Sequence, residues 1–227
     1  LILDPDRSKM SKRYSATSIG EYRKEGYLPE AMVNFMAFLG WHPKDEKELM
    51  TADELVKEFD LERIQKGGAV FNIEKLNWIN SQYIKNLSNE ELLQRIKDFG
   101  FAVKKISDAQ LAKIAGITKE RMKKLSDFSE LADFFFELPD YSSELLIWKE
   151  TPRETIKENL EAILKLAPDS GKIMKLAEEK GRGEILWPLR AALSGKMASP
   201  GPLEIMDILG EKESAKRIKT AIKKLSD

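Results

Sequence analysis

The strongest constraint on the fold is a set of helix start signals that recurs along the 227 residues. Thr51 with Glu54, and Ser88 with Glu91, form capping boxes, in which a hydroxyl and a glutamate three residues later satisfy the first free amides of a helix. Thr151 begins a third signal, which adds a first-turn proline. Almost no stretch shows the alternation of a half-buried strand. The sequence therefore predicts an all-α protein.

Other helices are predicted from apolar residues that recur every three or four positions. Ser18 is expected to cap a helix that Gly26 ends, Pro29 to open the next, and Gly116 to end a later one. Leu1 to Leu3 is expected to be the end of a strand. The predicted helical segments are 19–25, 29–39, 55–59, 73–83, 89–99, 107–116, 118–125, 153–164, 170–179, 184–193, 203–209 and 212–225.

The amino-acid composition excludes several classes of functional site. The chain has no cysteine and one histidine, His42, which excludes disulfides, cysteine nucleophiles and thiolate or polyhistidine zinc sites, so we expect no metal site. No apolar run approaches membrane-spanning length and no signal peptide is visible, so we expect a cytoplasmic protein without membrane contact. Because the chain opens on Leu1 rather than methionine, we expect it to be part of a longer protein.

Charge is balanced overall, with 38 basic and 38 acidic side chains, but it is sorted along the chain. Segment 104–124 is basic, segment 127–150 is acidic, and segment 212–227 is basic again. Such sorting lets a nearly neutral protein hold a phosphate backbone locally. For segment 104–124 two interpretations stay open, RNA contact or a solvated face. For segment 212–227 a solvated face of one amphipathic helix is favoured.

A basic run near the start carries the sharpest chemical signal. Arg7, Lys9, Lys12 and Arg13 lie within seven positions, and the serines between them favour a turn over a helix. Lysine on a loop is a compact point charge, suited to polyphosphate whose charge grows in a transition state. By charge alone, an exposed basic turn is the favoured interpretation of the run.

The order of these residues carries a family resemblance. Lys9, Met10, Ser11 and Lys12 resemble the signature loop of class I aminoacyl-tRNA synthetases, and residues 14–31 resemble the glutamyl-tRNA synthetases. Further segments resemble that family in the same order, and the helical C-terminal half resembles its bacterial type. These segments are 38–41, 71–80, 188–195, 199–201 and 204–210.

The resemblance implies a role for the chain within a larger enzyme. The full enzyme would attach glutamate to its tRNA through glutamyl-adenylate, with ATP and Mg²⁺. This chain would be its tRNA-binding part: a signature loop and stem-contact region over 1–88, then an α-helical-cage anticodon-binding domain of two modules, 89–147 and 148–227. Expected partners are tRNA and the N-terminal catalytic domain of the same protein. We expect a monomer, inactive without that domain.

The resemblance also implies site residues. Lys12 would be catalytic and would bind the ATP phosphates, with Lys9 and Ser11 in support. Arg121 falls where the family sets selectivity for the third anticodon letter, and a solvated charge is equally open there. Other expected anticodon contacts are Arg190, an exposed turn formed by Ser199, Pro200 and Gly201, and then Pro202 and Leu203, which replace the usual leucine–aromatic pair.

Rival interpretations remain. Tryptophans at four positions are expected to be core anchors rather than base platforms, and His42 a surface or capping residue. A non-catalytic helical RNA-binding or scaffold protein of the same fold is the alternative function. Whether glutamine tRNA is charged as well as glutamate tRNA stays open. The four tryptophans are Trp41, Trp78, Trp148 and Trp187.

Overall fold

The structure is a computed structural model that describes residues 1–10, 18–45, 47–102 and 106–226. Ser11 and Lys12 of the signature loop, and Lys104 and Lys105 of the basic segment, lie outside the described residues. The chain forms two compact units, Leu1–Glu130 and Leu131–Asp227, and each is considered by itself.

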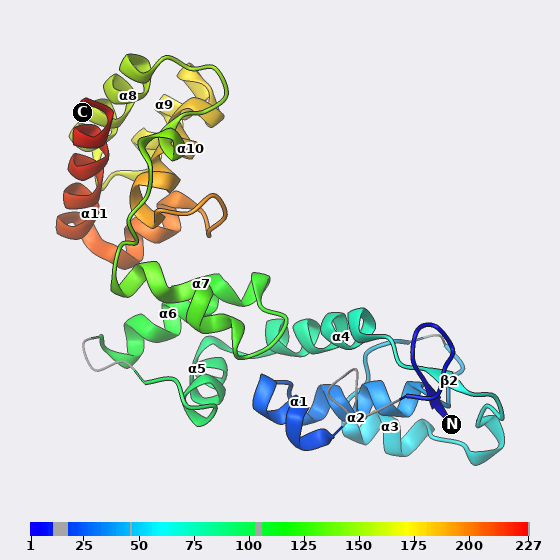
Figure 1. Cartoon of the computed structure of the whole chain (residues 1–227). Coiled ribbons are helices and arrows are strands. Elements are labelled where there is room, and N and C mark those ends of the chain that lie inside the picture. The colour runs from blue at the N-terminus through cyan, green and yellow to red at the C-terminus, as the bar shows by residue number, and fades with distance from the viewer. Residues whose placement is uncertain (11–17, 46, 103–105, 227) are drawn as a thin grey trace. The chain divides into compact units, whose positions relative to one another are not determined.

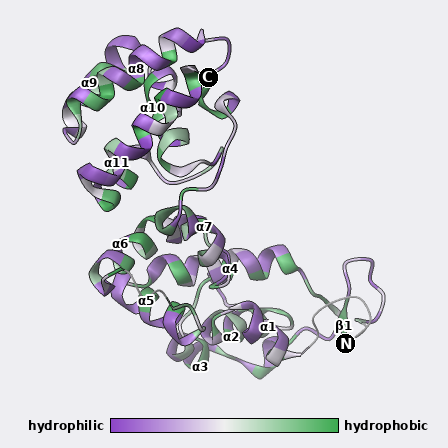
Figure 2. Ribbon diagram, turned by 60° about the vertical axis from the view of Figure 1, so that its left-hand side comes forward, coloured by the Kyte–Doolittle hydropathy of each residue, from purple (hydrophilic) through white to green (hydrophobic). Residues whose placement is uncertain are grey.

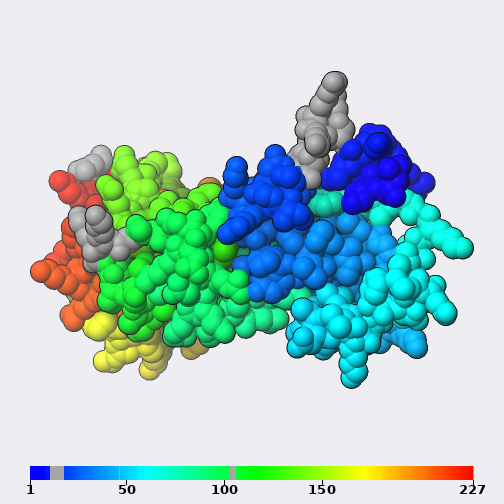
Figure 3. All heavy atoms as spheres, turned by 90° about the horizontal axis from the view of Figure 1, so that it is seen from below, coloured from blue at the N-terminus to red at the C-terminus, as the bar shows by residue number. Residues whose placement is uncertain are grey.

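The all-α prediction is confirmed (Figure 1). Among the described residues the only strands are β1 (Ile2–Leu3) and β2 (Ala69–Val70), which pair in parallel. The strand expected at the start of the chain is therefore present. In Figure 3 the turn that follows β1, in dark blue, bulges from the surface of the first unit.

Local start signals place most helices of the first unit. Thr51 and Ser88 form the predicted capping boxes with the glutamate three residues on. Ser18 caps its helix as predicted, and it also forms a capping box with Glu21. The elements are α1 (Ile19–Glu25), α2 (Pro29–Phe38), α3 (Ala52–Glu58), η1 (Leu61–Arg63), α4 (Ile73–Asn86), α5 (Asn89–Asp98), α6 (Asp108–Thr118), η2 (Lys119–Arg121) and α7 (Asp127–Phe136), which crosses the division between the units.

A buried asparagine, Asn34, helps to hold the core of the first unit together. Helices α2 and α4 pack on each other, with Leu76 and Ile79 of α4 fully buried. The Asn34 Oδ1 atom accepts hydrogen bonds from the Met50 amide (3.0 Å) and the Tyr83 hydroxyl (3.1 Å). Because buried polar groups need partners, these bonds fix the loop before α3 against the helix pair.

The predicted helix end at Gly116 is wrong. Helix α6 continues to Thr118, and only the short 3₁₀ helix η2 follows where a helix over 118–125 was expected. Gly116 is needed for close packing, because a Cβ there would lie 2.5 Å from the Asn89 Nδ2 atom at the start of α5. A glycine that ends a helix and one that permits close packing look alike in the sequence.

The second unit is a helical bundle. Its elements are η3 (Ser143–Leu146), α8 (Arg153–Leu166), α9 (Ser170–Lys180), α10 (Arg182–Ser194) and α11 (Pro202–Ser226). The helices carry both hydrophobic and hydrophilic positions, as amphipathic helices do (Figure 2). Gly210 has non-helical dihedrals (φ 76°, ψ 168°), so α11 is two helical segments, as the sequence predicted.

One start signal in this unit is not used as expected. The N-cap of α8 is Pro152, and no side chain caps it, so the predicted Thr151 cap is wrong. The Thr151 amide instead donates to the Trp148 carbonyl (3.0 Å), which closes a turn just before the helix. The helix still begins at the predicted place, since its apolar side is buried through Ile156, Leu160 and Ile163.

Candidate nucleic-acid interface

The described part of the signature loop is a tight, well-bonded turn. The Asp4 amide donates to the Ser8 carbonyl (2.9 Å) and the Arg7 amide to the Asp4 carbonyl (2.8 Å). Lys9 forms an antiparallel bridge with Leu3 of β1 and is exposed. Hydrogen bonds from the side chain and amide of Ser8 lower the pKa of Asp6, so this carboxylate stays charged. Hydrogen bonds therefore hold the backbone of the turn in place, and the Lys9 side chain extends from it into solvent.

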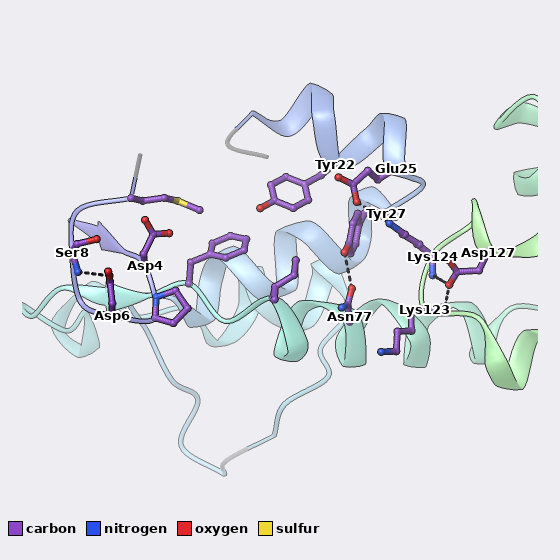
Figure 4. A pocket seen from close by; sticks show the side chains of 14 residues that line it. Asp4, Asp6, Ser8, Tyr22, Glu25, Tyr27, Asn77, Lys123, Lys124 and Asp127 are labelled. Carbon is purple, nitrogen blue, oxygen red and sulfur yellow. Dashed lines mark hydrogen bonds and ion pairs between the residues drawn. The ribbon is translucent and has the colours of Figure 1, made fainter. Parts of the chain in front are cut away.

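Beside this turn lies a cleft of about 910 Å³ (Figure 4). The Tyr27 hydroxyl donates to the Asn77 Oδ1 atom (2.6 Å). Burial, and then the charge of Glu25, raise the pKa of Tyr27 to about 12, so the phenol stays neutral. Carboxylates outnumber lysines on the walls, which makes the cleft unsuited to an RNA phosphate. Its charged residues are Asp4, Asp6, Glu25, Asp127, Lys123 and Lys124.

The segment after η2 docks on helices α1 and α4 of the first unit. The Leu125 amide donates to the Gly26 carbonyl (2.9 Å), and the Ser126 hydroxyl to the Glu25 carbonyl (2.8 Å). The Asn80 side chain accepts from the Leu28 amide (2.8 Å) and donates to the Lys123 carbonyl (2.5 Å). Arg121 is thus carried on an exposed 3₁₀ turn whose continuation is fixed by the first helices of the unit.

Three cations of the basic segment 104–124 have partners within the first unit. Lys119 donates to the Leu87 carbonyl (3.1 Å), Lys124 pairs with Glu25 (2.9 Å), and Lys123 lies 3.8 Å from Glu74. These contacts weaken the interpretation of the whole segment as an RNA-binding face. Arg121, near the end of the segment, is exposed.

The acidic segment 127–150 is likewise used for internal pairing in the second unit. Asp133 pairs with Lys196 (2.6 Å), and Asp140 with Lys224 (2.8 Å). In this unit the acidic segment therefore pairs with lysines that lie far along the sequence. The lysines at 212, 216, 219 and 223 remain exposed along one side of α11, as expected for a solvated face.

Arg190 lies in the penultimate turn of α10 and is half-buried. Its carbonyl accepts a hydrogen bond from the Ser194 hydroxyl (2.8 Å). Its buried Nε atom has no hydrogen-bond partner among the described residues. A buried guanidinium N–H without a partner is costly, and a ligand acceptor would remove that cost.

The expected exposed turn after α10 is not exposed. Ser199 is 2% exposed and Pro200 is buried, so the prediction of an exposed turn is wrong for these two residues. Pro202, which follows the turn, is buried too. The Gly201 amide donates to the Glu204 carboxylate (3.0 Å) at the start of α11. Gly201 and Leu203 remain partly exposed.

Sequence reasoning missed Met197. It lies in the loop between α10 and α11 and is 69% exposed. Its exposure has no signature in the sequence, since a methionine between two helices looks equally suited to the core. Trp41 is buried and Trp148 packs on Trp187 (centroids 5.2 Å apart), as expected of core anchors, whereas Trp78 is 40% exposed under the Lys75 ammonium.

The described residues offer neither a metal site nor a helix that could span a membrane. No group of three or more histidine, aspartate or glutamate side chains there is placed to hold a metal ion. Each helix there is too short or too polar to cross a membrane.

Comparison with known proteins gives consistent relatives. The family "Anticodon binding domain" matches residues 90–222, and "tRNA synthetases class I (E and Q), catalytic domain" matches residues 1–78. "Glutamate--tRNA ligase 1" of Fervidobacterium nodosum is 41% identical over 99% of this chain and 48% of its own length. "Glutamate--tRNA ligase 2" of Thermoanaerobacter pseudethanolicus is 35% identical over 98% of this chain and 50% of its own length.

A solved structure agrees with these relatives. The crystal structure of a glutamate tRNA ligase from Elizabethkingia meningosepticum, in complex with its amino acid, is 35% identical with a TM-score of 0.79. The match covers 98% of this chain and 50% of that one. The chain therefore spans about half the length of the relatives it matches.

Proposed function

Because the chain belongs to the glutamate–tRNA ligase family, we propose that it is the tRNA-binding part of an enzyme that attaches glutamate to its tRNA. The observation that carries this proposal is the anticodon-binding match across residues 90–222, which includes both Arg121 and Arg190. The site of action is the cytoplasm, where such an enzyme meets tRNA. No observation favours the alternative of a non-catalytic scaffold.

At the activation end, the chain supplies cations to ATP held by the other half of the enzyme. Lys12, with Lys9 and Ser11 in support, binds the phosphates, and the exposed ammonium of Lys9 on its fixed turn suits that task. ATP supplies the adenylyl group that activates glutamate. Mg²⁺ arrives mainly with the phosphates, as is usual in nucleotide sites. The chain without its catalytic half is expected to be inactive.

At the anticodon end, Arg190 and the loop before α11 read the bases. The unpaired Nε atom of Arg190 supports its role as a donor to a base edge or a phosphate. Gly201 and Leu203 touch the RNA from partly exposed positions, whereas Ser199, Pro200 and Pro202 act from within, by fixing the shape of the turn.

Arg121 is assigned to selectivity at the third anticodon letter. Its guanidinium offers a planar donor fork suited to a cytosine edge, and its exposure on η2 leaves that fork accessible. On this assignment the enzyme is restricted to glutamate tRNA. The modules 1–88, 89–147 and 148–227 describe functions, and the first two lie largely within one compact unit.

The test measures binding of glutamate tRNA and glutamine tRNA across a range of salt concentrations. Arg190→Ala is expected to weaken both by about 1–3 kcal/mol, the usual cost of one lost arginine contact. Arg121→Gln is expected to reduce the preference for glutamate tRNA. Arg182→Ala, at the exposed start of the same helix α10, is the matched control and should bind like the unchanged chain.

Two results would contradict the proposal. If the unchanged chain binds neither tRNA at low salt, the assignment to tRNA binding is wrong. If the chain binds but Arg190→Ala and Arg121→Gln behave like Arg182→Ala, the site residues are wrong while the function stands.

A further inference from the structure

We propose that Asn80 of helix α4 is a positioning residue for selectivity at the third anticodon letter, because it holds the turn that carries Arg121. This inference rests on the proposed function and deepens it. In that function Arg121 contacts the RNA, and Asn80 acts on the contact only through the backbone. A guanidinium distinguishes one base edge from another only when it is held within about 0.5 Å of the productive geometry. The groups that fix its turn therefore contribute to selectivity.

The turn is attached to α4 on both sides of Arg121, which is the last residue of η2. Before the turn, the Lys119 ammonium donates to the carbonyl of Leu87 (3.1 Å), the residue at which α4 ends. After it, the Asn80 side chain donates to the Lys123 carbonyl (2.5 Å). One helix therefore sets the position of the backbone that carries the exposed guanidinium.

The attachment through Asn80 is the more rigid of the two. Asn80 is fully buried, and both ends of its amide are bonded, since Oδ1 also accepts from the Leu28 amide (2.8 Å). A side chain bonded at both ends keeps one orientation, so its donor stays directed at the Lys123 carbonyl. Lys119, in contrast, reaches its partner through a flexible four-carbon chain. Losing the Asn80 donor also leaves that carbonyl without its side-chain partner.

The chain between Arg121 and the Asn80 bond is short and constrained. Met122 is 1% exposed, so its side chain is anchored in the core next to the exposed Arg121. The Met122 amide donates to the Lys119 carbonyl (3.2 Å), which closes η2, and the Lys123 amide donates to the Asp127 carboxylate (2.8 Å; Figure 4). A displacement of the backbone at Lys123 therefore moves Arg121, because no loose residue lies between them.

The experiment measures binding of the full 227-residue chain to two RNA hairpins. Both carry the anticodon stem and loop of glutamate tRNA, and one has its third anticodon letter changed from cytosine to guanine. Asn80→Ala is expected to reduce the preference for cytosine about 3- to 10-fold, a part of the roughly 5- to 150-fold that a well-aligned bidentate contact contributes. Arg121→Gln should reduce the preference at least as much. In the Arg121→Gln chain, Asn80→Ala should change the preference no further, since it acts through Arg121.

Asn34→Ala is the matched control for the loss of a buried asparagine. Asn34 is also fully buried in the first unit, but its hydrogen bonds are to the Met50 amide and the Tyr83 hydroxyl. Both alanine variants should lower the urea midpoint of unfolding, whereas only Asn80→Ala should change the preference between hairpins. Asn80→Asp is a second variant of nearly the same size, which keeps the acceptor for the Leu28 amide and loses the donor, and it should reduce the preference in the same direction.

The outcomes separate this inference from the proposed function. If Arg121→Gln reduces the preference but both Asn80 variants behave like Asn34→Ala, this inference is overturned and the proposed function survives. If Asn80→Ala reduces the preference equally in the Arg121→Gln chain, Asn80 does not act through Arg121 and the inference is again overturned. If Arg121→Gln leaves the preference unchanged, the assignment of Arg121 fails and this inference fails with it.

Discussion

Replacing Arg217 is expected to produce the largest loss of stability of any single polar substitution in the second unit. Arg217 lies in α11 and is 3% exposed. Its Nη1 atom donates to the carbonyls of Phe134 and Leu193, both at 2.7 Å, and its Nε atom donates to Glu213 (2.9 Å). Phe134 and Leu193 belong to the last turns of α7 and α10, whose carbonyls have no partner within their own helices.

The magnitude follows from these contacts. A hydrogen bond to a charged group contributes about 1.5–3 kcal/mol, and a cation at a helix C-terminus adds up to about 1 kcal/mol. Arg217→Met keeps much of the packing volume but leaves two buried carbonyls unpaired, and Glu213 keeps only the more distant Lys216 (3.7 Å). Some of that loss is recovered if water reaches the gap. We expect a net loss of about 3–5 kcal/mol, of the size seen when one partner of a buried charged network is removed.

Urea unfolding gives the measurement. Tryptophan fluorescence reports the second unit through Trp148 and Trp187, if Trp41 and Trp78 are first replaced by phenylalanine. At a slope of about 2 kcal/mol per molar urea, a 4 kcal/mol loss lowers the midpoint by about 2 M. Lys216→Met is the matched control, since that neighbouring side chain is 75% exposed, and its effect should stay within about 0.5 kcal/mol.

A result in which Arg217→Met and Lys216→Met unfold at the same midpoint would refute the reasoning. It would mean that the two carbonyls find other partners without cost. A functional consequence also follows, because Leu193 directly precedes the loop between α10 and α11, which carries the proposed anticodon contacts. Arg217→Met should weaken tRNA binding even at temperatures where the unit remains folded.

Three further outcomes are expected. Gly26→Ala should lower the free energy of unfolding by about 1–3 kcal/mol, because Gly26 has φ 89° and a Cβ there would lie 2.8 Å from the Ser126 amide nitrogen. Gly40→Ala is the control: its Cβ would meet open space, so this variant should unfold like the unchanged chain in the same urea assay. Burial raises the pKa of Tyr141 to about 12 from 10.0, so the folded state keeps a proton that the unfolded state loses. Stability should therefore fall between pH 10 and 12, and Tyr141→Phe should flatten that fall in urea midpoints taken across this range. Finally, ATP–pyrophosphate exchange with glutamate should be absent from the chain alone, and exchange at the rate of a whole enzyme would contradict its assignment as the tRNA-binding part.

The candidate site was only partly predictable. The family segments pointed to Arg190 and to the turn after α10, but a resemblance between sequences does not show which side chains are exposed. The structure shows that Ser199 is buried and Met197 is exposed, although both lie in the same loop. The prediction from the charge pattern was incomplete in the same way, since Lys119 and Lys124 of the basic segment bind partners within the first unit.

What the sequence determined by itself is the helical class and the place where most helices begin. Ser18, Thr51 and Ser88 bond to residues three positions away, so every atom of the signal lies within one turn. The tertiary structure alone decided which glycine ends a helix, which glycine allows a neighbouring helix to pack closely, and which cations stay exposed. Those outcomes depend on partners far along the chain, as in the bond from Arg217 to Phe134, and no local pattern encodes them.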